Sequence, residues 1–128
     1  MLGEDQVLIG VDIIEIARVR KAVERTPRFL KRVFTSREAA YCLQKSDPYP
    51  SLAARFAAKE ALRKLHPALI KGVRFCDLEV LREEDGRPRV VLHGEAQRRC
   101  QLEGIRDIAL SLSHTRDQAI AAVIAEKG

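Results

Sequence analysis

The chain has 128 residues and a formal charge of +5, with 46% hydrophobic and 32% charged residues. This usage is typical of a globular protein, and the length suits one domain, residues 1–128, around one core. No apolar run approaches the roughly 18 residues that a membrane helix needs, so we expect no transmembrane helix and no membrane partner.

Other features of the composition bear on the location of the protein and on the kind of partner it binds. The first six residues are acidic and a strand-like run follows them, so we expect no secretion signal. The three cysteines are widely spaced, which predicts plain thiols in a reducing cytoplasm and disfavours a zinc site. The positive charge favours an anionic partner: nucleic acid, an acidic protein or a phosphorylated small molecule. Aromatic residues make up only 5%, so a base-stacking surface is poorly supplied.

The first half of the chain predicts one strand followed by helices. A short run rich in β-branched residues predicts the strand, and amphipathic periodicity and a capping-box pattern at Thr35 predict the helices. We expect the strand at residues 7–14 and the helices at 15–25, 35–45 and 51–65. Ser51 is the expected N-cap of the last helix.

The second half predicts mainly strands. Residues 84–87 carry the signal of a hairpin turn, and Gly104 is a helix stop signal. We expect strands at 76–81, 88–92, 108–113 and 119–125 and a helix at 94–102. Helices that come early and strands that come late, after one initial strand, predict an α+β fold with a largely antiparallel sheet.

The alanine-rich helix offers a first place for chemistry. Arg55, Lys59 and Arg63 share one stripe, whereas Glu60 and Lys64 lie one turn apart on a flank that they share with alanines. Glu60 and Lys64 can be a surface ion pair, which would contribute a few tenths of a kcal/mol, about 0.2–0.5. Alternatively, the small neighbours leave room for a ligand at the carboxylate, beside Lys59 and Lys64.

Asp12 and the basic residues after it offer a second place. Asp12 interrupts an apolar strand, where it either caps the next helix or is held at the strand end to bind a cation. Arg18, Lys21 and Arg25 form one stripe of that helix. The stripe is either a solvated face or the docking site of a partner that approaches beside Asp12.

A third place is the end of the strand at 108–113, where Ser113, His114 and Thr115 supply several hydrogen-bond donors. No hydrolase nucleophile elbow, Walker loop or dinucleotide-binding glycine motif is present in the sequence. Two carboxylates suit Mg²⁺, and lysine and histidine donors suit phosphates. Together these groups indicate metal-assisted phosphoryl-type transfer.

Three motifs in this order resemble one family. The sequence has G-x-D-I-x-x-I-x-R at 10–18, R-F-A-x-K-E-A at 55–61 and S-x-S-H-T at 111–115, with shorter matches at 34–38 and 86–88. It resembles the small 4'-phosphopantetheinyl transferases, the holo-acyl-carrier-protein synthase family. The resemblance implies a 4'-phosphopantetheinyl transferase-like fold, in which the early helices pack on a mainly antiparallel sheet.

The resemblance also implies an activity and its residues. Such enzymes move the phosphopantetheine arm of coenzyme A to a serine of an apo acyl carrier protein and release adenosine 3',5'-bisphosphate. Asp12 and Glu60 would bind Mg²⁺, Lys64 would contact a phosphate, and Glu60 is the candidate base, so these three are the implied catalytic residues. The residues implied to bind coenzyme A are Lys64, Ser113, His114 and Thr115.

The family further implies a homotrimer with active sites between protomers, a cytoplasmic location, and a carrier held by Arg18, Lys21 and Arg25. Two departures stand out: Gly72 is the one glycine kept in a turn that is often glycine-rich, and Ile14 stands where larger relatives have a third metal ligand. Two rival hypotheses are a small basic nucleic-acid-binding domain and an inactive scaffold subunit. The carrier served, fatty-acid or polyketide, does not follow from the sequence.

Overall fold

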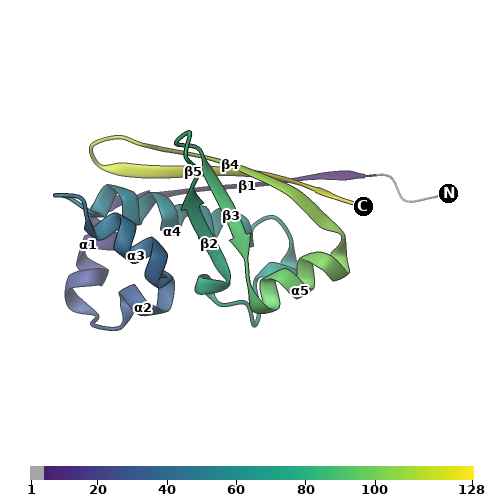
Figure 1. Ribbon diagram of the computed structural model, residues 1–128, viewed down its shortest axis with the longest axis horizontal. Coiled ribbons are helices and arrows are strands. Elements are labelled where there is room, and N and C mark those ends of the chain that lie inside the picture. The colour runs from purple at the N-terminus through teal and green to yellow at the C-terminus, as the bar shows by residue number, and fades with distance from the viewer. Residues whose placement is uncertain (1–4) are drawn as a thin grey trace.

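The computed structural model describes residues 5–128 and contains two antiparallel sheets with helices (Figure 1). The strands are β1 (Gln6–Glu15), β2 (Leu78–Arg82), β3 (Pro88–Leu92), β4 (Ile105–His114) and β5 (Gln118–Lys127). The helices are α1 (Ile16–Arg25), α2 (Phe29–Val33), α3 (Ser36–Leu43), α4 (Tyr49–Arg63), α5 (Gly94–Glu103) and the short 3-10 helices η1 (Pro67–Leu69) and η2 (Phe75–Asp77). Residues 1–4 of the acidic start lie outside the described residues. No helix within 5–128 is long and apolar enough to cross a membrane.

The larger sheet has the strand order β1-β5-β4, and the helices gather on one face of it (Figure 1). Strict alternation along β5 explains this arrangement. Its small or β-branched residues at every second position are fully buried, and those between them are exposed. Because successive side chains of a strand point to opposite faces, the buried set faces the helices. The buried residues of β5 are Ala119, Ala121, Val123 and Ala125.

Helix α4 packs on this sheet through small residues and runs antiparallel to β1. Its first half lies in one buried cluster with Ile14 and Ala119, and its second half lies in another with Leu8 and Val123. The backbones of α4 and β1 lie very close together at Gly10, because a Cβ at this position would overlap the backbone oxygen of Ala61. A glycine at this point of β1 therefore lets the helix approach the strand closely.

The opposite face of the sheet carries large aliphatic side chains that are exposed in the described chain. Ile9 is 65% exposed and Ile124 is 48% exposed, and the two are partners in the β1–β5 register. Contiguous apolar patches on a protein surface mark interaction sites. We call this surface the aliphatic sheet face. Its large members are Val7, Ile9, Val11, Ile13, Ile120 and Ile124.

Strands β2 and β3 form a separate hairpin that crosses in front of the larger sheet (Figure 1). The turn between them contains Gly86 at φ 92°, a left-handed conformation that favours glycine. Its backbone bonds join Glu83 to Arg87 and Gly86 to Glu83. The hairpin predicted around residues 84–87 is therefore confirmed.

Most predicted elements are confirmed, including the capping box at Thr35, whose hydroxyl accepts from the Glu38 N–H. The α+β class with antiparallel sheets is also confirmed. The expected N-cap at Ser51 is wrong. Helix α4 begins at Tyr49 after Pro48, because Pro50 in the first turn needs no hydrogen-bonded N–H. Helix α2 was not predicted.

Candidate active site

Asp12 and Lys64 meet between β1 and α4. The Lys64 ammonium donates to Asp12 Oδ1 at 2.8 Å and to the Val11 carbonyl at 3.0 Å. The Asp12 side chain is 18% exposed and that of Lys64 is 54% exposed. The interpretation of Asp12 as a helix cap is excluded, because the N-cap of α1 is Glu15. The carboxylate is instead held on the helix-facing side of β1 at the rim of the protein.

Glu60 lies on the same flank of α4, one turn before Lys64. From the Gly10–Ala61 contact to Asp12 the strand advances about 6.6 Å, slightly more than one helical turn. Because α4 runs antiparallel to β1, Asp12 is level with the turn at 57–60. Lysine side chains lean toward the helix N-terminus, which explains how Lys64 reaches back to Asp12. Lys64 therefore joins the strand that carries Asp12 to the helix flank that carries Glu60.

The second carboxylate is only partly covered. Glu60 is 31% exposed, and its nearest cation is Arg63, whose Nη1 lies 3.4 Å from Oε1. Of the two alternatives for Glu60 and Lys64, the surface ion pair does not form in the described chain, since Lys64 pairs with Asp12. Within residues 5–128 no group of three or more His, Cys, Asp or Glu is placed to hold a metal. Two partly exposed carboxylates fit a divalent ion that keeps several bound waters, as Mg²⁺ usually does in proteins.

Lys59 does not belong to this site, contrary to the expectation that it would lie beside Glu60 and Lys64. Its side chain is completely buried and its ammonium bonds to Glu38 at 2.8 Å. Successive helix residues point about 100° apart, so Lys59 faces the interior while Glu60 faces the rim. Burial lowers the pKa of Lys59, and the charge of Glu38 opposes that shift.

Ser113 and His114 are the last two residues of β4, Thr115 follows them, and none of the three is hydrogen-bonded to Asp12 in the described chain; alternation places His114 on the helix side of the sheet. In the sheet register, Asp12 of β1 is opposite Ala121 of β5, and Ala121 is opposite Leu112 of β4. Strand β5 thus lies between the other two, and the backbones of β1 and β4 are about 10 Å apart. Ser113 is exposed and points to the aliphatic sheet face, away from the helices. Thr115 accepts from the N–H groups of Asp117 and Gln118, which closes the β4–β5 turn.

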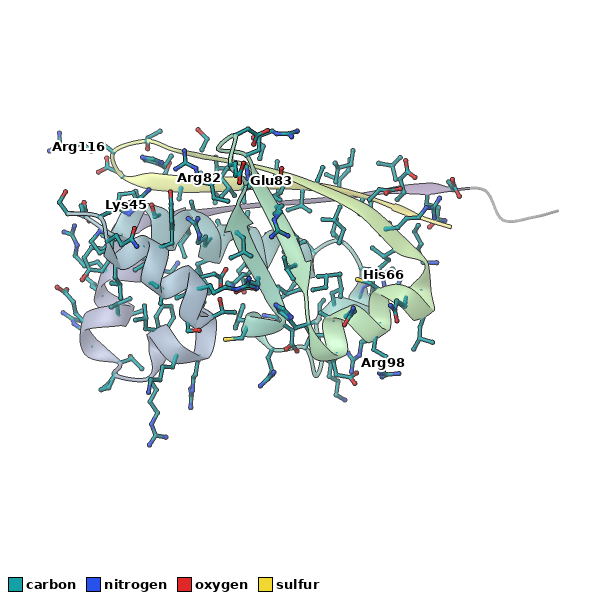
Figure 2. All side chains as sticks on the ribbon, viewed as in Figure 1. Lys45, His66, Arg82, Glu83, Arg98 and Arg116 are labelled. Atoms are coloured by element: carbon teal, nitrogen blue, oxygen red, sulfur yellow. The ribbon has the colours of Figure 1, made fainter. Side chains whose placement is uncertain are left out.

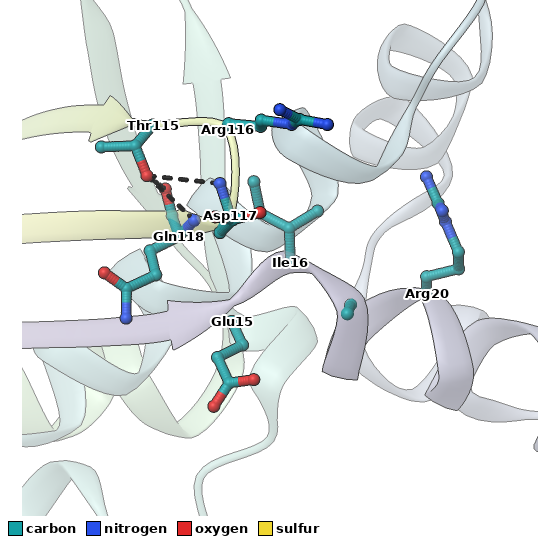
Figure 3. A pocket seen from close by; sticks show the side chains of 8 residues that line it. Glu15, Ile16, Arg20, Thr115, Arg116, Asp117 and Gln118 are labelled. Carbon is teal, nitrogen blue, oxygen red and sulfur yellow. Dashed lines mark hydrogen bonds between the residues drawn. The ribbon is translucent and has the colours of Figure 1, made fainter.

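A pocket of about 470 Å³ connects Thr115 to the start of α1 (Figure 3). Arg20 and Arg116 stand on two sides of it, and Glu15 and Asp117 also line it. Figure 2 shows Arg116 at the same end of the molecule as Lys45. Neither arginine was predicted as a site residue. Only the position of Arg116 directly after Thr115 could have indicated it, and Arg20 lies outside the predicted basic stripe.

The basic stripe of α1 has the exposure that a docking surface needs. Arg18, Lys21 and Arg25 are exposed, whereas Ile16 and Val19 on the other side of the helix are buried. The stripe begins one turn after the end of β1. The positive charges of this stripe therefore lie close to the strand that contains Asp12.

Comparisons with known proteins agree with one another. The family model described as the 4'-phosphopantetheinyl transferase superfamily matches residues 8–123. A holo-[acyl-carrier-protein] synthase of Moorella thermoacetica is 48% identical over 120 residues, which is 91% of each chain. One from Caldanaerobacter subterraneus subsp. tengcongensis is 40% identical over 123 residues, or 96% of this chain and 97% of that one.

Solved structures give the same result. A Chronobacterium ammoniagenes structure described as an ACPS–CoA complex has a TM-score of 0.85 and 29% identity, and it covers 96% of this chain and 98% of its own. A Helicobacter pylori holo-[acyl-carrier-protein] synthase in complex with coenzyme A has a TM-score of 0.77 and 31% identity, with coverage of 92% and 99%.

Proposed function

Because the chain belongs to the 4'-phosphopantetheinyl transferase superfamily, we propose that it transfers 4'-phosphopantetheine from coenzyme A to a serine of an apo acyl carrier protein. The observation that carries this proposal is the contact between Asp12 and Lys64, with Glu60 on the same helix flank. It brings a carboxylate and a cation together at the rim, with a second carboxylate one helical turn before Lys64 on α4. Relatives named holo-[acyl-carrier-protein] synthase and a structure described as a coenzyme A complex support the choice of substrates.

We propose that Asp12 and Glu60 hold Mg²⁺. The donor set fits this ion, because both groups are carboxylates and each is open enough on one side to share the ion with water and phosphate oxygens. When bound, the ion would offset the negative charge of the pyrophosphate. Ile14 supplies no third ligand.

The reaction breaks one phosphorus–oxygen bond of the pyrophosphate and forms another to the carrier serine. The serine oxygen attacks the phosphorus of the phosphopantetheine arm, and adenosine 3',5'-bisphosphate leaves with the bond electrons. Lys64 has three N–H donors, and its bonds within residues 5–128 use two of them, so one can reach a phosphate oxygen of the leaving group. We assign the proton of the serine hydroxyl to Glu60.

We propose that coenzyme A is also bound by Ser113, His114 and Thr115, but from a second copy of the chain. In one chain Ser113 points away from Asp12, so a second protomer would be needed to bring Ser113 to the site of Asp12. The aliphatic sheet face offers the apolar surface for that contact. A homotrimer of 128-residue, single-domain protomers with sites between them satisfies both observations.

We propose that the acidic carrier docks on Arg18, Lys21 and Arg25. Exposed charges of one sign steer an oppositely charged partner and orient it on contact. We also assign the reaction to the cytoplasm. The free thiols Cys42, Cys76 and Cys100 support a reducing compartment.

The direct test is to incubate the protein with coenzyme A, Mg²⁺ and a panel of apo carriers from fatty-acid and polyketide systems and to weigh each carrier. We expect one or more carriers to gain the mass of a phosphopantetheine group. Asp12→Ala and Glu60→Ala should each lower the rate about a hundredfold or more while circular dichroism stays unchanged. A panel in which no carrier gains this mass would refute the proposed activity.

A further inference from the structure

Lys59 and Glu38 form a completely buried ion pair that the proposed chemistry does not use. The Lys59 ammonium bonds to Glu38 Oε1 at 2.8 Å and to the carbonyls of Phe75 at 3.0 Å and Leu78 at 2.8 Å. Both side chains are 0% exposed. Each of the three N–H donors of the lysine thus has an acceptor, so the group is fully satisfied without solvent.

The carboxylate of this pair is bonded as completely as the ammonium. Glu38 Oε1 also accepts from the Thr35 N–H at 2.9 Å, which closes the capping box of α3. Glu38 Oε2 accepts from the Val80 N–H at 2.8 Å. The pair therefore joins α3, α4 and the η2–β2 segment at a single point, directly beside Glu60 in the sequence.

Helix α4 needs such a fixed point because its packing face is almost smooth. Five of the nine residues that it buries are alanines, which offer only a methyl group to interlock with their neighbours, and its large buried apolar side chains are Leu52 and Leu62. Small side chains resist sliding or rotation of a helix less than large ones, because they form shallow ridges. Contact at Gly10 fixes how close α4 lies to β1, but it does not fix how far the helix is turned about its axis.

We propose that Lys59 and Glu38 are positioning residues that set the rotation of α4, so that Glu60 and Lys64 face Asp12 across β1. The proposal rests on the proposed transferase function. In some proteins a buried polar or ionic group fixes a unique geometry while adding little to net stability, and we assign that role to this pair. A helix rotation that moves catalytic groups by about 1 Å can lower a rate about a hundredfold.

The test compares Lys59→Met and Glu38→Gln with wild type and with a matched control, Glu79→Gln. Glu79 is also buried and charged in the same region, but the hydrogen bonds of its side chain within residues 5–128 go to Thr35, Arg37 and His93 rather than to α4. We would measure kcat, the KM for coenzyme A and for carrier, and the Kd of Mg²⁺ by calorimetry with coenzyme A present.

We expect Lys59→Met to lower kcat by about tenfold to a hundredfold and to weaken Mg²⁺ binding about tenfold, while both KM values change less than about threefold. Glu38→Gln keeps an oxygen for Lys59 and should give a smaller change of the same kind, which is informative if Lys59→Met does not fold. Glu79→Gln should lower the melting temperature and leave Mg²⁺ affinity unchanged.

The inference fails if folded Lys59→Met or Glu38→Gln keeps the kcat and the Mg²⁺ affinity of wild type, or if Glu79→Gln weakens Mg²⁺ binding equally. Failure of the proposed transferase function can be recognised separately, because in that case the wild-type protein would not transfer phosphopantetheine to any carrier. Calorimetry needs no turnover, so the effect on the metal site remains measurable in variants of low activity.

Discussion

Glu79 shows how one buried carboxylate can keep its charge. It is 1% exposed, and burial alone would raise its pKa. Hydrogen bonds from Thr35, Arg37 and His93 outweigh that effect and lower the pKa from 4.5 to about 2. The folded protein therefore holds this carboxylate in the ionised form, with partners on α3 and on the loop before α5.

This pKa predicts a pH dependence of stability. Because the pKa is lower in the folded state, the ionised group stabilises the fold above about pH 4.5, and the contribution is lost as the pH falls toward 2. Urea denaturation at a series of pH values should show the free energy of unfolding falling more steeply for wild type than for Glu79→Gln in this interval. If the free energies of unfolding of the two proteins changed with pH in the same way, the lowered pKa of Glu79 would be contradicted.

At the scale of elements, the contact between β1 and α4 allows no added atom at Gly10. A Cβ there would overlap the Ala61 carbonyl oxygen, which is backbone and cannot rotate away. We predict that Gly10→Ala destabilises the fold by about 1–3 kcal/mol, the usual cost of overpacking, and separates Asp12 from Lys64. Thermal unfolding monitored by circular dichroism measures the first effect, and the rate of carrier modification measures the second. A stable and fully active variant would show that the strand can move without consequence.

The proposed docking of the carrier protein depends on the basic residues of helix α1. Arg18→Glu reverses one exposed charge of the basic stripe, so we predict that it raises the KM for carrier about tenfold and leaves the KM for coenzyme A unchanged. Arg98→Glu makes the same change of net charge on α5, at the far end of the molecule from α1 (Figures 1 and 2), and should alter neither value. Equal effects of the two variants would indicate a general dependence on charge instead of a docking site.

At the scale of the whole molecule, sequence patterns predicted the features that depend on nearby residues. The strand at β1, the Thr35 capping box and the β2–β3 hairpin are of this kind, as are the residue types of the candidate site. Lys59 was placed wrongly because its three acceptors come from residues 38, 75 and 78. No local pattern reveals that those segments converge on one helix face.

Ser113 illustrates a second limit of prediction, because its relation to Asp12 depends on more than one chain. Its motif resembles a coenzyme-binding sequence, yet the alternation of β4 turns it to the aliphatic sheet face. Family resemblance suggested the trimer, whereas the pattern of the strands alone did not. The exposed isoleucines of β1 and β5 would supply the physical reason for the assembly that we propose.

The proposed trimer can therefore be tested by a substitution on the aliphatic sheet face. Ile124 is 48% exposed and lies in its middle, so Ile124→Glu should place a charge in the proposed interface and convert the proposed trimer to monomer. Leu102→Glu is the matched control, because Leu102 is 70% exposed on α5, away from this face. Light scattering coupled to gel filtration gives the mass of each species. Because Asp12 and Ser113 of one chain face apart, the monomer should lose transfer activity while its Asp12 and Glu60 still bind Mg²⁺. A monomer with wild-type activity would mean that one chain holds a complete site.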